Sequence, residues 1–386
     1  MLYKSQHAYL KGRGTHTAIF EFTEKILQEL EEKNQVMGLF LDLTKAYDCV
    51  NHKILLKKLE RYGVAGVLLA WLGSYMSGRL QQTAITKEGI SYTSSKESVE
   101  IGIQQGSILS PILFIIYIND APISVANLNC FLCDYADDKN ILVAEKDLNA
   151  ALTGTLNKIY EALSNWISNE GLLLNHNKTD CVFFKTRRSN VDCPDHISLN
   201  GVEIGVSTEA RLLGMTIDET LSWEVHIDKL AKKLNSVCYT LRVMSQYLNV
   251  CGLKMIYSSC FEAPLRYGVV FYGSVRASDI IFRTQKRAIR IINKLSFRAS
   301  CRGFFRSSEK NLPSHSYNSR SCNFVYPIHR LTVTEKGAKY ACMKLFNRLP
   351  LRFKQMDNKY VFRRELHKLL IELEPYTVLE YLNASL

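Results

Sequence analysis

Three aspartates beside short apolar segments constrain this chain more than any other feature of its sequence. Asp42 directly follows the apolar run 39–41, and the pair Asp137–Asp138 separates the apolar runs 130–135 and 140–144. The first pattern is typical of a buried strand, and the second predicts a β-hairpin with a polar turn. If the strand and the hairpin share one sheet, the three carboxylates converge, and their mutual repulsion then requires a bound cation.

Carboxylates grouped in this way suit one kind of chemistry. A single aspartate after a strand, or a single pair at a turn, is usually a turn residue or a helix cap. Oxygen ligands that gather at one place instead fit Mg²⁺, which takes few carboxylates and completes its shell with water and phosphate oxygens. Two such ions activate an attacking hydroxyl and stabilise a leaving pyrophosphate. The pattern therefore favours a metal-dependent phosphoryl-transfer site.

The rest of the 386-residue chain mixes helices and strands. Helical spacing of apolar residues, with Asn51 as an N-cap and Gly63 as a stop, predicts helices over 15–31, 51–62, 112–118 and 148–166. Further strands are predicted over 91–103, 181–184 and 212–217. From Trp223 onward the pattern changes to long amphipathic helices rich in lysine and arginine. We therefore expect an α+β chain with two domains, 1–218 and 219–386.

Positive charge is the second strong feature. The chain has 49 Lys and Arg against 37 Asp and Glu, a net charge of +12, which indicates a polyanionic partner such as nucleic acid or an acidic membrane surface. Residues 281–306 contain eight basic side chains and no acidic one. Phe282, Ile289 and Ile292 form an apolar stripe on the predicted helix. Four basic residues share another face: Arg283, Arg287, Arg290 and Lys294. A solvated helix face is the alternative, but the absence of carboxylates favours contacts with phosphates.

The cysteines and the apolar runs limit the cellular compartment. Eleven cysteines stand at irregular spacing, which does not suit a disulfide framework and predicts a reducing environment. No secretory signal opens the chain, and its longest apolar run, 112–118, is too short to span a membrane. We expect a protein of the nucleus, the cytoplasm or both, with no membrane partner.

Five segments follow one another in a distinctive order along the chain. They are 40–48 (FLDLTKAYD), 105–111 (QGSILSP), 135–138 (YADD), 173–179 (LLNHNKT) and 212–218 (LLGMTID). In this order they resemble motifs A, B, C and D and the primer-gripping hairpin of the reverse transcriptases of non-LTR (LINE-type, jockey-like) retrotransposons. The tail also resembles the region that follows the polymerase in these elements, through 267–268, 344–347 and 349–350. The similarity covers nearly the whole chain.

The resemblance implies a right-hand polymerase with an α+β fold. A palm of antiparallel strands and partial fingers would occupy 1–218, and a helical thumb and C-terminal region would occupy 219–386. The implied reaction is RNA-directed DNA synthesis, a two-metal nucleotidyl transfer from deoxynucleoside triphosphates onto a primer 3′-hydroxyl. Template RNA and a DNA primer are then the partners, and their phosphates would meet the basic helix face.

The implied catalytic roles fall on the acidic cluster and one lysine. Asp42 and Asp137 would be the principal ligands of two Mg²⁺ ions, with Mn²⁺ as an alternative metal. Asp138 would be a third, less demanding acid. Lys178 would protonate the leaving pyrophosphate or stabilise it electrostatically. The alternative for Lys178, given equal weight, is an exposed turn lysine.

The other implied roles concern the incoming nucleotide. The main-chain carbonyl of Leu43 would face a metal ion. Tyr47 would block a ribose 2′-hydroxyl and so select deoxynucleotides. Gln105 would hydrogen-bond to the nucleotide, and Gly106 would let the backbone approach it. Asp48 would support this arrangement without binding metal.

Two departures from the family pattern keep alternatives open. Gln104 stands where a proline usually precedes Gln105, which removes a φ constraint from that loop. The chain also begins just before 5–9, well inside the usual polymerase. We therefore expect an N-terminally truncated copy that lacks an upstream fingers segment and binds nucleotides poorly. The main alternative is a catalytically impaired fragment that only binds nucleic acid. An RNA-templated RNA polymerase is a weaker alternative, because Tyr47 is bulky.

Overall fold

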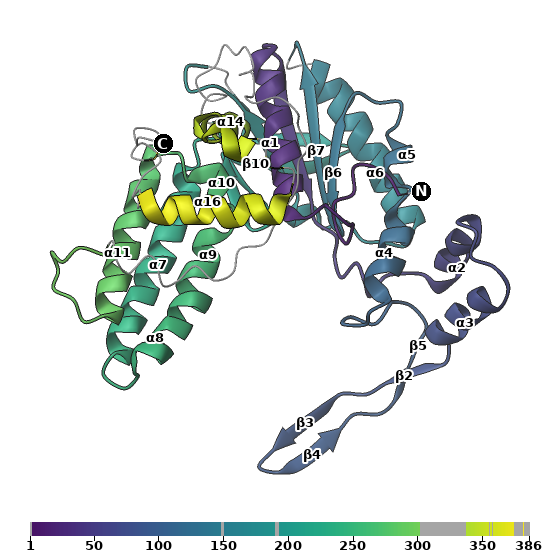
Figure 1. Ribbon diagram of the computed structural model, residues 1–386. Helices are drawn as coiled ribbons and strands as arrows, with labels where there is room; N and C mark the ends of the chain where they lie inside the picture. The colour runs from purple at the N-terminus through teal and green to yellow at the C-terminus, as the bar shows by residue number, and fades with distance from the viewer. Residues whose placement is uncertain are drawn as a thin grey trace. The chain divides into compact units, whose positions relative to one another are not determined.

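The computed structural model describes residues 2–147, 150–189, 193–301, 337–354, 356, 358–373 and 381. The chain divides into two compact units, Met1–Leu213 and Gly214–Leu386. The first unit combines a β-sheet with helices, and the second is built mainly from helices (Figure 1). This is the α+β composition that the sequence predicts.

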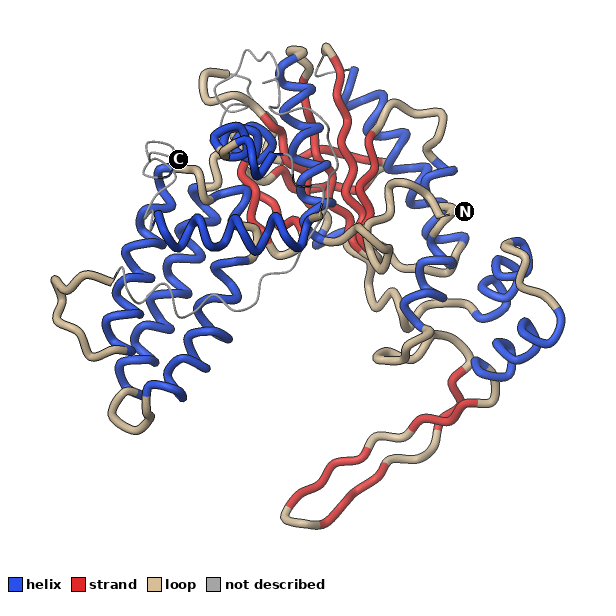
Figure 2. The backbone as a smooth tube through the Cα atoms, in the orientation of Figure 1, coloured by secondary structure: helices blue, strands red, loops and turns tan. Residues whose placement is uncertain are grey.

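A six-stranded sheet forms the centre of the first unit (Figure 2). Its strands, in spatial order, are β6 (Phe131–Tyr135), β7 (Asp138–Glu145), β1 (Gln35–Leu41), β8 (Asp180–Phe184), β10 (Val202–Val206) and β9 (His196–Leu199). All neighbouring strands are antiparallel except β8 and β10, which are parallel. The structure thus has the implied palm sheet, with one parallel pair in it.

Helices pack on both faces of this sheet, which explains why β1 is apolar along most of its length. On one face lies α1 (Thr15–Glu31), where the ring of Phe22 is 5.6 Å from that of Phe40. On the other face, α6 (Asn157–Asn169) joins the core around Leu39. The apolar residues that predicted the helix over 15–31 by their spacing are all buried: Ala18, Ile19, Phe22, Ile26, Leu27 and Leu30.

Four helices and a long ribbon complete the first unit. The helices are α2 (His52–Arg61), α3 (Gly66–Met76), α4 (Ser110–Ile118) and α5 (Ala121–Ser124). The ribbon pairs β2 (Arg79–Gln81) with β5 (Glu97–Val99) and β3 (Ala84–Lys87) with β4 (Ile90–Thr93). The N-cap prediction is confirmed, because the Asn51 side chain accepts hydrogen bonds from the amides of Lys53 and Ile54.

Two strand and helix predictions need correction. The strand-like segments predicted over 91–103 are observed as β4 and β5, whereas β2 and β3 were not predicted. The helix predicted over 148–166 begins as a π-helix, Ala150–Leu156. The strand predicted over 212–217 is broken at Leu213, which has a φ of 48°. The result is two strands, β11 (Glu209–Leu212) and β12 (Met215–Asp218).

The long helices predicted from Trp223 onward are confirmed in the second unit. The longer ones are α7 (Glu224–Met244), α11 (Asp279–Ile292), α14 (Ala338–Arg348) and α16 (Lys359–Leu373). Shorter ones are α8 (Val250–Ile256), α9 (Ala263–Arg266), α10 (Val269–Tyr272) and α15 (Leu351–Lys354). The carboxylate of Asp218 accepts the amides of Ser222 and Trp223 just before α7. No helix in the described part of the chain has the length and apolarity to cross a membrane.

Candidate active site

The sheet brings together the three aspartates predicted from the sequence. β1 ends at Leu41, which pairs with Lys139 of β7. Because these strands are antiparallel, Asp42 and Asp138 occupy the next pair of positions. Asp137 precedes Asp138 in the turn of the β6–β7 hairpin. The register therefore places the three aspartates where β1 ends and β7 begins.

The pKa values of two of these aspartates, Asp137 and Asp138, are raised. Burial raises the pKa of Asp137 above its usual value, and repulsion from Asp42 raises it further. The pKa of Asp138 rises to about 6, first because its carboxylate is partly desolvated and then because Asp137 and Asp42 repel it. Asp138 remains exposed, so solvent screens part of this repulsion. The result is a site with an excess of negative charge.

The chemistry of this donor set fits a divalent cation. All three side chains are carboxylates, which are hard oxygen ligands of the kind that Mg²⁺ binds. A cation among them would relieve the repulsion that raises the pKa values of Asp137 and Asp138. Within the described residues, no group of three or more His, Cys, Asp or Glu side chains is already gathered as a coordination set. The cluster thus supplies the right ligand type and charge.

Lys178 lies beside this cluster, in the turn that precedes β8. Its Nζ is 3.7 Å from Oδ2 of Asp42. Two backbone hydrogen bonds hold the turn there, because Asn175 donates its amide to the carbonyl of Asp42 at 2.9 Å and Thr44 donates its amide to the carbonyl of Leu173 at 2.8 Å. The structure therefore brings Lys178 to the first aspartate.

Leu43 follows Asp42 and is buried, with 5% of its surface exposed. Its backbone forms an isolated antiparallel bridge with Leu174. The hydrogen bonds of this bridge use the carbonyl of Asp42 and the amide of Thr44. The carbonyl of Leu43 does not take part in them, which is compatible with its implied contact to a metal ion.

Tyr47 is held by aromatic stacking. Its ring stacks on Phe114 of α4, with centroids 4.5 Å apart and an interplanar angle of 16°. The pKa of Tyr47 is raised first by burial, then by a hydrogen bond with Tyr9, and then by the charge of Asp137. The neutral hydroxyl therefore lies near both the N-terminal segment and the hairpin turn.

Gln105 and Gly106 lie in the loop before α4. Nε2 of Gln105 donates to Oδ1 of Asp48 at 3.2 Å, so Asp48 supports the glutamine. The same two segments are joined through backbone, because Ile103 donates its amide to the carbonyl of Tyr47 at 2.9 Å. Gly106 has a φ of +84°, a region that other residues rarely adopt. The loop is thus fixed to the segment that carries Tyr47.

Two residues that shape this region were not singled out in the sequence. Gly102 has a φ of +87°, and a Cβ there would lie 2.8 Å from the carbonyl oxygen of Asp48. A lone glycine before the 105–111 segment was the available signal for it. Nδ2 of Asn175 lies 3.5 Å from Oδ2 of Asp42. Its signal was its place in the 173–179 segment that resembles motif D.

The basic residues singled out in the sequence belong to the second unit and do not share one helix face. Lys294 lies beyond the end of α11, with a φ of +52° that closes the helix. Arg283 and Arg287 are exposed on α11. Arg290 is half-buried, and its Nε donates to the carbonyl of Ala299 at 3.0 Å. The predicted four-residue face is therefore wrong for Lys294, and Arg290 is partly engaged within the fold.

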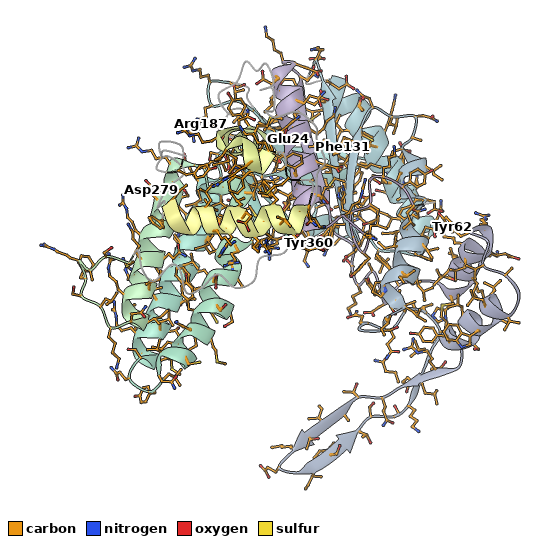
Figure 3. The ribbon with its side chains drawn as sticks, viewed as in Figure 1. Glu24, Tyr62, Phe131, Arg187, Asp279 and Tyr360 are labelled. Atoms are coloured by element: carbon orange, nitrogen blue, oxygen red, sulfur yellow. The ribbon has the colours of Figure 1, made fainter. Side chains whose placement is uncertain are left out.

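Figure 3 labels Asp279, the first residue of α11. In the apolar stripe of this helix, Ile289 and Ile292 are buried as predicted, whereas Phe282 is half-buried. The buried residues of the helix are Ile281, Thr284, Ala288, Ile289 and Ile292. Arg302 and Arg306, part of the same basic run, lie outside the described residues.

These features define a class of protein. A palm sheet whose adjacent strands present three aspartates, with a lysine beside them, is the arrangement implied above for a nucleic-acid polymerase. The family model described as "Reverse transcriptase (RNA-dependent DNA polymerase)" matches residues 2–217. This chain belongs to the reverse transcriptase family.

Two curated relatives confirm the expected similarity to jockey-like elements. The RNA-directed DNA polymerase from mobile element jockey of Drosophila melanogaster is 27% identical over 286 residues, covering 72% of this chain and 30% of the relative. The probable RNA-directed DNA polymerase from transposon BS of the same species is 28% identical over 305 residues, covering 74% and 32%. The chain thus spans about a third of the length of these relatives.

Among solved structures, apo telomerase from Candida tropicalis has a TM-score of 0.41 and 15% identity over 78% of this chain and 49% of its own.

Proposed function

We propose that this chain carries out RNA-directed DNA synthesis, adding deoxynucleotides from their triphosphates to the 3′-hydroxyl of a primer on an RNA template. One observation carries the proposal: in a member of the reverse transcriptase family, the register of β1 and β7 sets Asp42 beside the Asp137–Asp138 hairpin. Phosphoryl transfer depends almost entirely on positioning and charge stabilisation, which such a cluster can supply.

Two Mg²⁺ ions, or Mn²⁺ in their place, are the cofactors we propose for this cluster. Bound there, they would activate the primer hydroxyl and neutralise charge on the leaving pyrophosphate. Asp42 and Asp137 would be their principal ligands, Asp138 a third acid, and the carbonyl of Leu43 a neutral ligand. The raised pKa values of Asp137 and Asp138 support this assignment, because carboxylates that repel one another gain most from a shared cation.

Lys178 is proposed to act on the leaving group. Its side chain is 70% exposed while its Nζ stays 3.7 Å from Oδ2 of Asp42, so the ammonium can reach a ligand held at the cluster. It would donate a proton or a charged hydrogen bond to the pyrophosphate. The alternative gives Lys178 a surface ion pair of little energetic value.

Three residues are proposed to sort and hold the incoming nucleotide. Tyr47, fixed by its stacking on Phe114, would block a ribose 2′-hydroxyl. Gln105, oriented by Asp48, would hydrogen-bond to the nucleotide. Gly106 would let the backbone come close to it, because its positive φ and missing side chain leave open space there.

The basic residues on α11 and just after it are proposed to contact phosphates of the template and primer. Arg283, Arg287 and Lys294 are exposed, as phosphate ligands need to be. Arg290 would contribute less, because its Nε is bound to the carbonyl of Ala299.

The compartment we propose is the nucleus, the cytoplasm or both. The ten described cysteines are all free thiols. Free thiols in this number are typical of a reducing compartment. Template RNA and deoxynucleotides are present in both places.

Primer extension tests the proposed function. The chain is incubated with oligo(dT) annealed to poly(rA), dTTP and Mg²⁺, and incorporation of dTMP is followed. We expect extension that requires both the RNA template and the divalent cation. Binding of the template–primer without extension would support the alternative of a nucleic-acid-binding remnant. Preferred incorporation of ribonucleotides would support an RNA polymerase.

A further inference from the structure

The turn that carries the proposed metal ligands holds a conformation unfavourable to its own sequence. It consists of Ala136 and Asp137, between the paired residues Tyr135 and Asp138. Ala136 has a φ of +52°, whereas Asp137 has a negative φ. This is the φ pattern of a type II′ turn, whose first position usually requires glycine. An alanine kept there points to a contact from outside the hairpin that holds it.

A side chain near the N-terminus supplies such a contact. Oε1 of Gln6 accepts the backbone amide of Ala136 at 3.1 Å and the backbone amide of Ala8 at 2.8 Å. Gln6 is 5% exposed and Ala136 is 4% exposed, so water does not replace this oxygen easily. In a two-residue hairpin, the amide of the first turn residue points away from the hairpin and has no partner within it. Gln6 thus satisfies a buried donor that the turn cannot satisfy itself.

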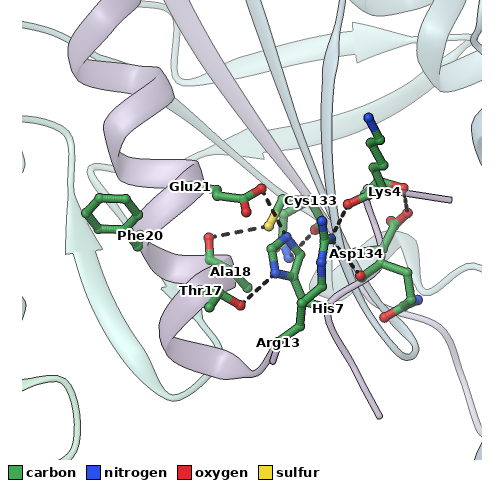
Figure 4. A network of polar contacts seen from close by, with 12 residues as sticks. Lys4, His7, Arg13, Thr17, Ala18, Phe20, Glu21, Cys133 and Asp134 are labelled. Atoms are coloured by element: carbon green, nitrogen blue, oxygen red, sulfur yellow. Dashed lines mark hydrogen bonds and ion pairs between the residues drawn. The ribbon is translucent and has the colours of Figure 1, made fainter. Parts of the chain in front are cut away.

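The segment that carries Gln6, residues 2–13, is fixed to the outer strand of the sheet, and we call it the N-terminal arm. Asp134 of β6 donates its amide to the carbonyl of Ser5 and accepts the amide of His7, each at 2.9 Å. Gln6 therefore pairs with β6 in a parallel bridge. Nη1 of Arg13 donates to the carbonyl of Gln6 at 2.9 Å. Figure 4 shows His7 and Arg13 of the arm beside Asp134. β6 is the edge strand of the sheet, so the arm covers an open edge.

We propose that Gln6 is a positioning residue for the Asp137–Asp138 pair, an inference that rests on the proposed function. By holding the amide of Ala136, Gln6 sets the turn conformation and with it the direction in which the two carboxylates project. Gln6 does not touch substrate or metal and acts through the turn. Tyr9 of the same arm lies beside Tyr47, so the arm reaches the site at a second point.

Removing the accepting oxygen tests this role. Gln6→Met keeps most of the side-chain volume and loses the acceptor. We expect the Ala136 amide to exchange with solvent at least about tenfold faster than in the parent chain, while amides within β7 stay unchanged. In extension of oligo(dT) on poly(rA), kcat should fall about 10–100-fold with little change in KM for dTTP, because misplaced groups lose rate more than binding. Gln28→Met, the same change at an exposed position of α1, is the matched control and should alter neither quantity.

A second substitution separates positioning from general stabilisation. Glycine adopts the positive φ of the turn without strain. Ala136→Gly added to Gln6→Met should therefore restore most of kcat although the hydrogen bond stays absent. A purely structural role for Gln6 instead lowers the melting temperature and gives a kcat that glycine does not restore. If Gln6→Met does not fold, Gln6→Asn, which withdraws the oxygen by one methylene, takes its place.

The outcomes distinguish this inference from the proposed function. Unchanged exchange at Ala136 in the Gln6 variant, or a lost kcat that Ala136→Gly fails to restore, overturns the positioning role. If the parent chain does not extend a primer at all, the proposed function fails. The exchange rate of Ala136 then decides by itself whether Gln6 sets the turn.

Discussion

Two charged regions of this chain are built in opposite ways. The acidic cluster joins residues from paired strands, and burial and the charge of Asp42 raise the pKa values of Asp137 and Asp138. The basic residues of α11 belong to one helix, where Arg283 and Arg287 lie exposed to solvent. Charges that are costly to assemble persist where a reaction needs them at fixed positions. Charges spread over a surface are enough to bind a polyanion, because they need not meet particular phosphates of it. From this difference we propose that the first region performs the chemistry and the second supplies affinity.

The largest effect is expected from breaking the acidic cluster. Asp137→Asn keeps the shape of the side chain and removes a proposed principal metal ligand. Extension should fall by about 10³-fold or more, because the loss of several kcal/mol of charge stabilisation has this effect on rate. Binding of poly(rA)/oligo(dT), followed by fluorescence anisotropy, should stay close to that of the parent. An Asn variant with full activity would remove Asp137 from the mechanism.

The next effect is expected at Lys178. Lys178→Met removes the ammonium and should slow extension about 100-fold, the range typical of a lost proton donor. Lys53→Met, at an exposed lysine of α2, is the matched control and should leave the rate unchanged. Equal rates for both variants would assign Lys178 to a surface ion pair with Asp42 and to nothing else.

Sugar selection should respond to Tyr47 by a smaller factor. Tyr47→Ala opens space beside the ring of Phe114 and should reduce the preference for dTTP over UTP by about 10–100-fold, as expected when a steric barrier is removed from a pocket. The ratio of kcat/KM for the two nucleotides measures it. Tyr47→Phe, which keeps the ring, should retain the parent preference. A ratio unchanged in the alanine variant would show that the ring does not exclude the 2′-hydroxyl.

The basic region should control affinity and its dependence on salt. Each neutralised phosphate contributes roughly 0.7–0.9 to the slope of log K against log salt. Changing Arg283, Arg287 and Lys294 together to Gln should therefore flatten the slope by about two units. Arg364→Gln with Lys368→Gln is the matched control, because both side chains are already paired with Glu365. Equal slopes for the two variants would assign these three basic residues to folding or solubility.

The smallest effect concerns stability without metal. The folded chain holds the proton of Asp138 more tightly than the unfolded chain, because the pKa rises from 3.8 to about 6. This contribution to stability is present below pH 3.8 and is lost as the pH rises through about 6. The free energy of unfolding of Asp138→Asn at pH 7 should therefore exceed that of the parent by at most about 1 kcal/mol, because solvent screens this exposed group, and the variant should melt at a higher temperature. The difference should vanish at pH 3.5 and shrink when Mg²⁺ is added, and a difference independent of pH would refute its electrostatic origin.

Local signals predicted local structure well. The helical period of 15–31 and the cap at Asn51 follow from neighbouring residues, and both are observed. The end of α11 before Lys294 was missed because the basic residues continue past it at helical spacing. The left-handed φ of Lys294, which closes the helix, has no signal in that spacing. Strands β2 and β3 of the ribbon were missed because strands that are largely exposed on both faces carry no alternating pattern.

The sequence predicted the candidate site residues that residue types and motifs mark, but not the contacts that hold them in place. The aspartates and Lys178 were found because runs of apolar residues and family motifs mark them, and the sheet register then placed them together. The contact between Gln6 and Ala136 joins residues 130 positions apart, and no periodicity encodes it. The sequence does not predict the positive φ of Ala136, because alanine rarely adopts it and only the structure shows it.

Incorporation of a single nucleotide tests the central claim most directly. The chain is assembled with poly(rA)/oligo(dT) at saturating protein, and radiolabelled dTTP with Mg²⁺ is added for one turnover. Parallel reactions contain Asp137→Asn at the same measured occupancy of template–primer. The account predicts a primer lengthened by the parent chain and an unextended primer with the variant. Equal behaviour of the two proteins at equal occupancy, whether both extend or neither does, would contradict the claim that the acidic cluster of this chain performs nucleotidyl transfer.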